Sequence, residues 1–161
     1  MSQSEALIRR PEEGDTVANP AGGDLTYKAR NGQTGGALTV WESTAAPGEG
    51  PPVHVHRNED EFMYVLEGEL RFRLAETDRT APAGSFVFIP RNLPHTWQNA
   101  GDGEARILFG FTPGSPGMER FFERAAELPD ETRLAEAFGE FAEDAGMQVL
   151  GPPLAQSGSG S

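Results

Sequence analysis

Short apolar stretches separated by glycine, proline and polar residues run through the first two-thirds of the chain. The run 62–66 is continuously apolar and ends at a Glu-Gly-Glu turn. The segment 69–74 (Glu-Leu-Arg-Phe-Arg-Leu) then alternates charged and apolar residues. A period of two places the apolar side chains on one face of a strand and the charged ones on the other. This pattern predicts a β-hairpin whose second strand has one solvated face.

The same criteria predict further strands at 25–29, 37–43, 53–56, 85–89, 95–98 and 105–111. Turns rich in glycine and proline separate them, and the chain contains 20 Gly and 13 Pro. Many short strands joined by such turns are typical of a sandwich or barrel. We therefore expect residues 25–112 to form a mainly β domain. Residues 1–24 are expected to form an N-terminal arm with a strand near Leu7–Arg9.

The pattern changes to helical spacing after Pro113. Ser115 is suited to cap a helix with Pro116 at its first position. Met118, Phe121, Phe122, Ala125 and Ala126 then recur at the spacing of one helix face.

A second helix is predicted after Asp130, which we expect to be its cap, with Gly146 as its stop. Residues 113–150 are too few for a core of their own and are expected to form a helical appendage on the barrel. Its aromatic residues are expected to serve in packing, and a lid over a pocket mouth is the sharper alternative. The Gly/Ser-rich end of the segment 151–161 predicts a flexible tail.

Composition narrows the possible partners. The net charge of −12 disfavours nucleic acid and anionic membranes as partners, and it leaves a small-molecule substrate open. The absence of Cys excludes disulfides, thiolate zinc sites and cysteine nucleophiles, so any metal must use nitrogen and oxygen ligands. No stretch has the length of a membrane span and no apolar leader is visible. We therefore expect a soluble, cytoplasmic protein.

The histidines form the main chemical signal. The chain has only three, and His54 and His56 are two residues apart, so on a strand both imidazoles point to the same side. Glu61 stands immediately before the apolar run 62–66, where an unpaired carboxylate would be costly. If the strand of His95 neighbours that of His54, all four groups converge. Three imidazoles and a carboxylate suit one divalent transition metal ion: Ni, Fe, Mn, Co, Cu or Zn.

The spacing of these residues resembles the two sequence motifs of the cupin superfamily. Gly48, His54, His56, Glu61 and Gly68 match the first motif in full, with five, one, four and six residues between them. Gly84, Pro90, His95 and Asn99 match the second, which departs from the family only at Asn92, where cupins usually have Gly. Asn is the non-Gly residue that best tolerates the positive φ required there.

This resemblance implies a double-stranded β-helix, the cupin jelly roll, with His54, His56, Glu61 and His95 as metal ligands. It also implies a homodimer, because cupins commonly pair through their sheets. Within the superfamily the chain is similar to single-domain cupins related to quercetin dioxygenases, through the segments 50–56, 60–69, 111–122 and 151–154.

The likeness to quercetin dioxygenases implies a dioxygenase that acts on an enolisable, flavonol-like aromatic substrate, with Glu61 as the proton acceptor. A non-oxidative isomerase, lyase or polyketide cyclase, and a non-catalytic small-molecule-binding cupin, are the alternatives. Met63 and Val65 share parity with Glu61, and Trp97 shares parity with His95, so these side chains are expected to face inward. The expected substrate-pocket residues are Met63, Val65, Phe72, Phe88, Trp97 and Phe109.

Overall fold

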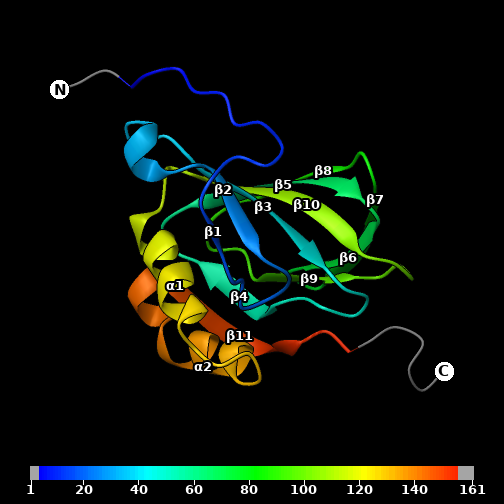
Figure 1. Cartoon of the computed structure of the whole chain (residues 1–161). Coiled ribbons are helices and arrows are strands. Elements are labelled where there is room, and N and C mark those ends of the chain that lie inside the picture. The colour runs from blue at the N-terminus through cyan, green and yellow to red at the C-terminus, as the bar shows by residue number, and fades with distance from the viewer. Residues whose placement is uncertain (1–3, 156–161) are drawn as a thin grey trace.

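The computed structural model describes residues 4–155, and its architecture is two antiparallel sheets packed face to face (Figure 1). The six-stranded sheet has the order β1 (Thr16–Val17), β2 (Leu25–Ala29), β3 (Thr39–Ala45), β10 (Ala105–Thr112), β5 (Asp60–Glu67) and β8 (Phe86–Ile89). The five-stranded sheet has the order β11 (Met147–Pro153), β4 (Pro52–His56), β9 (His95–Asn99), β6 (Glu69–Leu74) and β7 (Thr77–Pro82). The expected mainly β jelly roll is confirmed, but its sheets extend beyond the expected range 25–112, since they include β1 and β11.

The core lies between the sheets and follows strand parity. Along β5, Met63 and Val65 are fully buried, whereas Tyr64 between them is exposed. Trp41 on β3 stacks on Phe109 of β10 with ring centroids 5.1 Å apart, and Trp97 of the other sheet lies 5.7 Å from the same Phe109 ring. Aromatic pairs at such distances stabilise a core beyond the area they bury.

The outer face of the six-stranded sheet is partly apolar. β5 pairs with β8 so that Tyr64 lies opposite Phe86 and Phe62 opposite Phe88. Phe86 is 63% exposed, Phe88 52% and Tyr64 41%. Phe88 therefore faces solvent, and its expected place in a substrate pocket is wrong. Residues 86–89 are all apolar, so the sequence does not show which of them face the core. Pairing with β5 decides this and places Phe88 on the outer face.

The helices lie over one end of the barrel (Figure 1). They are the short 3-10 turn η1 (Asn31–Gln33), α1 (Pro116–Ala126), α2 (Arg133–Glu140) and the 3-10 turn η2 (Glu143–Ala145). Ser115 caps α1 as expected, because its hydroxyl accepts a hydrogen bond of 3.0 Å from the backbone N–H of Met118. The second helix begins later than expected, with Thr132 rather than Asp130 at its N-cap, and Gly146 ends η2 in a left-handed conformation.

A buried carboxylate attaches α1 to the barrel. Glu119 accepts hydrogen bonds from the guanidinium of Arg30 (3.0 Å), the backbone N–H of Asn31 (2.8 Å) and the hydroxyl of Thr39 (2.7 Å). Five residues of α1 are buried, whereas Ala137 is the one fully buried residue of α2. The first helix is therefore held much more firmly than the second.

Three edge strands escaped the sequence analysis. Residues 151–153 belong to β11, not to a flexible tail, and residues 156–161 of that predicted tail lie outside the described residues. β11 contains Gly151, Pro152 and Pro153, which read as a strand breaker, but an edge strand tolerates proline on its open side. β7 is polar and exposed, and the arm forms its strand at β1 rather than near Leu7–Arg9.

Within residues 4–155, none of the helices has both the length and the apolar character that crossing a membrane demands.

Candidate metal centre

Three imidazoles meet at the end of the barrel that the helices cover. His54 and His56 project from alternate positions of β4, and β4 pairs with β9 so that His54 lies opposite His95. The ring centroids are 4.4 Å apart for His54 and His95, 4.9 Å for His54 and His56, and 5.6 Å for His56 and His95. All three residues are buried. The convergence expected from their spacing is therefore present.

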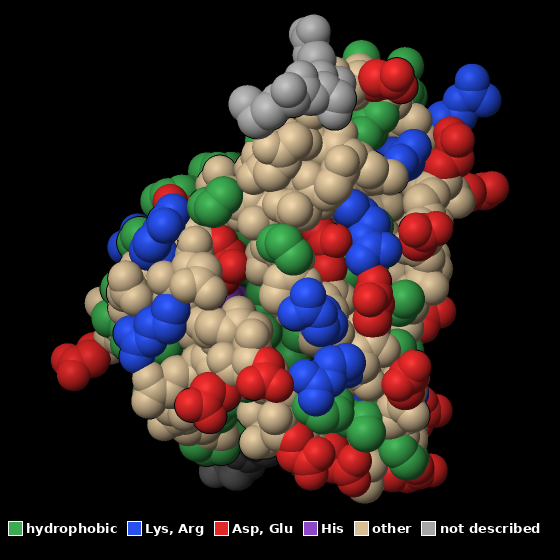
Figure 2. Space-filling model, turned by 90° about the vertical axis from the view of Figure 1, so that its left-hand side faces the viewer, with side chains coloured by type: hydrophobic (Ala, Val, Ile, Leu, Met, Phe, Trp, Pro, Cys, Tyr) green, Lys and Arg blue, Asp and Glu red, His purple; other side chains and the backbone are tan. Residues whose placement is uncertain are grey.

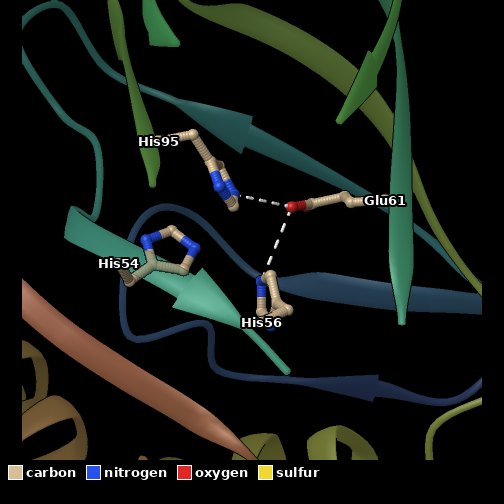
Figure 3. A group of neighbouring side chains, drawn as sticks. All are labelled: His54, His56, Glu61 and His95. Carbon is tan, nitrogen blue, oxygen red and sulfur yellow. Dashed lines mark hydrogen bonds and ion pairs between the residues drawn. The ribbon is translucent and has the colours of Figure 1, made fainter. Parts of the chain in front are cut away.

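Glu61 completes the group from the opposite sheet. It lies near the start of β5, and its side chain points across the barrel at the imidazoles (Figure 3). Its Oε1 atom is 3.1 Å from His95 Nε2 and 3.5 Å from His56 Nε2. One ligand atom from each of the four residues lies within 4.8 Å of all the others. Atoms bound to a single ion by bonds of about 2.1 Å lie at most about 4.2 Å apart, so small inward shifts suffice for ligation.

Backbone carbonyls fix the orientation of two rings. His54 Nδ1 donates to the carbonyl of Pro52 at 2.7 Å, and His95 Nδ1 donates to that of Leu93 at 2.9 Å. A carbonyl only accepts, so each Nδ1 carries a proton and Nε2 is the atom that each ring directs at the centre. Lone pairs that face an ionised carboxylate need a positive charge between them. This donor set therefore fits a divalent metal ion, and a proton is the alternative cation.

Burial and charge set the protonation of the group. Burial raises the pKa of Glu61, but hydrogen bonds and attraction from His56 and His95 outweigh it and hold that pKa well below the usual range. Burial, followed by repulsion from His95 and His56, lowers the pKa of His54 well below 6.5. At neutral pH the site therefore holds an ionised carboxylate and a neutral His54, the forms that bind metal.

The turn that precedes His95 in the second cupin motif helps to position the ligands. Asn92 adopts a φ of 70°, as its place in the motif predicted, and its backbone N–H donates to the carbonyl of His56 at 2.8 Å. This bond holds the turn before His95 against the end of β4. Asn92 thus helps to place His56 and His95, which are 39 residues apart in the sequence.

Glu59 is a second buried carboxylate behind His56. Its Oε1 atom lies 3.7 Å from His56 Nδ1, and neither atom has a hydrogen-bond partner among the described residues. Burial raises the pKa of Glu59, and a hydrogen bond with Ser115 offsets part of that rise. Carboxylates in this position orient a ligating imidazole. The sequence analysis placed Glu59 in the acidic cluster beside Glu61 but gave it no role.

A small cavity of about 50 Å³ adjoins the ligands. Of the expected pocket residues, Trp97 and Phe109 line it, whereas Met63, Val65 and Phe72 are buried in the core and do not. The appendage supplies part of its wall through Met118, Phe121, Phe122 and Phe138. These residues were assigned to packing from helical spacing, and they meet the cavity only because the appendage folds over the barrel end. Their position beside the cavity corresponds to the alternative role considered for the appendage, a lid over a pocket mouth.

The sequence model of the family described as "Cupin domain" matches residues 41–111. Protein SchB of Streptomyces halstedii is 33% identical over 98 residues, which cover 59% of this chain and 70% of SchB. The chain belongs to the cupin superfamily. The cupin is also 34% identical over 134 residues to Germin-like protein 1-1 of Oryza sativa subsp. japonica, covering 74% of the chain and 61% of that protein. Polyketide synthase CurC of Streptomyces cyaneus is 37% identical over 70 residues, covering 44% and 46%.

The cupin thus spans less than two-thirds of the length of two of these three relatives. Among solved structures, an RmlC-like cupin from Shewanella frigidimarina aligns with a TM-score of 0.60 at 19% identity. The alignment covers 73% of this chain and 99% of that one. At this identity the likeness supports the fold and not the activity. The chemistry of this cupin therefore rests on its own site residues.

Loss of a ligand tests the metal assignment. We expect elemental analysis of the purified cupin to find about one divalent transition metal ion per chain, as a site with one ligand set predicts. His56→Ala should lose most of that metal and keep its β-type circular dichroism. Glu67→Gln, on the exposed end of β5, is the matched control and should keep the metal. Wild-type metal content in the His56→Ala protein would refute the site.

Acid should destabilise the chelator-treated cupin. Folded His54 has a lowered pKa and stays neutral where unfolded His, with a pKa of 6.5, takes up a proton. The unfolded state then binds more protons, so the free energy of unfolding falls as pH drops below about 6.5, by up to about 1.4 kcal/mol per pH unit for this group. Glu61 has a lowered pKa and acts in the same direction at lower pH. Urea denaturation between pH 7.5 and 5.5 measures the slope, and a flat profile contradicts the expectation.

Proposed function

We propose that this cupin is a metal-dependent enzyme that moves a proton on an enolisable, oxygen-rich aromatic substrate. The observation that carries the proposal is the ionised carboxylate of Glu61 among three buried imidazoles, next to an apolar cavity. An ionised carboxylate can accept a proton when a substrate C–H or O–H lies within its reach, and a metal ion bound to His56 and His95 would remove the hydrogen bonds that lower the pKa of Glu61.

A divalent metal ion held by His54, His56, Glu61 and His95 would supply Lewis-acid chemistry, lowering the pKa of a substrate proton beside a carbonyl or hydroxyl oxygen. Glu61 accepts that proton at its carboxylate. His54 and His95 keep their orientation through the carbonyls of Pro52 and Leu93, and their Nε2 atoms would bind the ion rather than compete for the proton.

The walls of the cavity are mainly apolar and aromatic. Trp41 and Trp97 lie on opposite sheets, and Phe109 and Phe111 line the cavity between them. Aromatic walls contact planar ligands over a large area, and a dry site strengthens electrostatic interactions. The name of the relative CurC, a polyketide synthase protein, supports a polyketide-type substrate with several phenolic or keto oxygens.

Dioxygenation of a flavonol-like substrate is the second candidate. The apolar cavity of about 50 Å³ is large enough for dioxygen beside the ligand atoms. The motif resemblance to quercetin dioxygenases supports the same outcome. Both candidates begin with removal of a proton by Glu61, and they differ in the need for oxygen.

Activity assays of the metal-loaded cupin on polycyclic phenolic ketones and flavonols separate the candidates. For the first we expect equal turnover with and without oxygen, and for the second a stoichiometric oxygen uptake. In both cases Glu61→Gln should lower kcat by about 100-fold or more, because the amide cannot accept the proton. Glu67→Gln is the control and should retain activity. Tight binding without turnover of any substrate would leave the non-catalytic alternative.

We further propose that the cupin forms a homodimer through the outer face of β5 and β8. Phe86, Phe88 and Tyr64 expose a continuous apolar surface there, of a kind that marks association sites. Sedimentation velocity should find a dimer for the wild type and a monomer for Phe86→Ser/Phe88→Ser. A wild-type monomer, or a dimer that survives the double substitution, would refute this interface.

A further inference from the structure

The cavity beside the ligands is much smaller than the substrate proposed above. Its volume of about 50 Å³ is little more than the share of one or two water molecules in liquid water. Sites for drug-sized ligands measure about 300–1,000 Å³. One or two oxygen atoms of a substrate fit this cavity, and its ring system does not. A second space must hold the body.

A groove of about 890 Å³ lies outside the cavity, between α2 and β11. Leu134, Ala135 and Phe138 of α2 form one wall, and the opposite wall is formed by β11 and by Pro52 at the start of β4. Most of the lining is apolar, and Arg57 and Glu143 are its charged members. Figure 2 shows a face of the molecule on which basic and acidic side chains are interspersed and the histidines are almost hidden.

Phe138 and Met147 separate the groove from the cavity, since each lines both spaces. The Phe138 ring lies 6.2 Å from the His54 ring and 5.2 Å from that of Phe121. Met147 pairs with His56 across β4 and β11 and is therefore fixed by the sheet. Phe138 sits on α2, of which Ala137 is the one buried residue.

The attachments of the two helices differ in the way that such movement requires. Glu119 bonds α1 to the barrel through three buried or part-buried hydrogen bonds. Arg133 of α2 bonds to the carbonyls of Ala125 and Leu128, at the end of α1. Within residues 4–155, no side-chain hydrogen bond joins α2 to a strand. An element with few buried side chains and no such bonds opens at low free-energy cost.

We infer that the groove between α2 and β11 is the seat of the substrate body, and that Phe138 is the gate through which the metal-binding head enters the cavity. The inference rests on the proposed function for the identity of the ligand. The ligand class is a flat, multi-ring phenol or ketone with two oxygens at one end. Its apolar rings lie along Leu134, Ala135 and the prolines of β11, and its oxygens reach the His54 side of Phe138.

The two tryptophans of the chain allow the gate to be tested directly. Trp41 and Trp97 both line the cavity and are almost fully buried. Acrylamide, a small neutral quencher, therefore reports entry into the cavity through tryptophan fluorescence. In the Zn²⁺-loaded cupin we expect Phe138→Ala to raise the quenching constant about threefold or more, because the barrier to the groove is removed.

Phe141→Ala is the matched control. Phe141 follows α2, and the centre of its ring lies 3.9 Å from Arg124 Cζ. It lines neither the cavity nor the groove. Its substitution loosens the same region without opening the gate and should leave quenching near the wild-type value. Equal quenching in wild type and Phe138→Ala would overturn the gate. An equal rise in both variants would do the same, because it would report general loosening of the appendage.

The groove is tested with two ligands of different size. Gly139 lines it, and a Cβ added there meets no atom within 4 Å, so Gly139→Phe fills space without a backbone clash. On the Zn²⁺-loaded cupin, this variant should weaken binding of the flavonol quercetin about tenfold and leave binding of the one-ring catechol within about twofold. Equal effects on both ligands, or no quercetin binding to wild type, would overturn the groove assignment.

These outcomes are distinct from failure of the proposed function. Acrylamide entry needs neither turnover nor a metal and can be repeated on the chelated chain. A cupin without catalysis can still show the Phe138 effect, and an active Glu61-dependent enzyme can lack it.

Discussion

The structure depends on one electrostatic requirement, the need for a cation where three imidazole lone pairs face an ionised carboxylate. His54 and His95 present Nε2 because backbone carbonyls accept from their Nδ1–H groups, and Glu61 faces these nitrogens from the opposite sheet. Without a positive charge between them these groups repel one another in a site of low dielectric. The fold holds them together, and a divalent metal ion would relieve the repulsion.

Both sheets contribute to this arrangement. β4 and β9 carry the imidazoles in the five-stranded sheet, and β5 carries Glu61 in the six-stranded sheet. The aromatic contacts of Trp41, Trp97 and Phe109 set the separation of the sheets just beyond the ligands. The geometry of the polar site therefore depends on the hydrophobic core, because the packing of the aromatic rings places the carboxylate opposite the imidazoles.

The helical cover places aromatic side chains over the barrel end beside the ligands. α1 is bonded to the barrel by Glu119, which also satisfies the backbone N–H of Asn31 and the hydroxyl of Thr39. α2 rests on α1, and β11 returns the chain to pair with β4. A rigid first helix and a weakly held second one give the site protection from water together with a route of entry. Neither property alone suits a substrate larger than the inner cavity.

The amino-acid sequence by itself determined the mainly β domain, the residues of the candidate metal centre and the first helix, and its resemblance to the cupin motifs implied the jelly roll. Period-two alternation, the spacing of His54, His56, Glu61 and His95, and the cap at Ser115 are local patterns, and local geometry follows from them directly. Asn92 is a similar case, since its side chain tolerates a positive φ in any fold.

Only the tertiary structure decided what surrounds the site. Pro152 and Pro153 argued against a strand at β11. An edge strand tolerates proline, but an edge position is a property of the whole sheet and cannot be recognised in the segment alone. Phe88 turned outward through its pairing with Phe62. Phe138 became a cavity wall because α2 folds over the barrel end. Strand order, cross-strand parity and helix docking join residues that are distant in the chain, so no local pattern contains them.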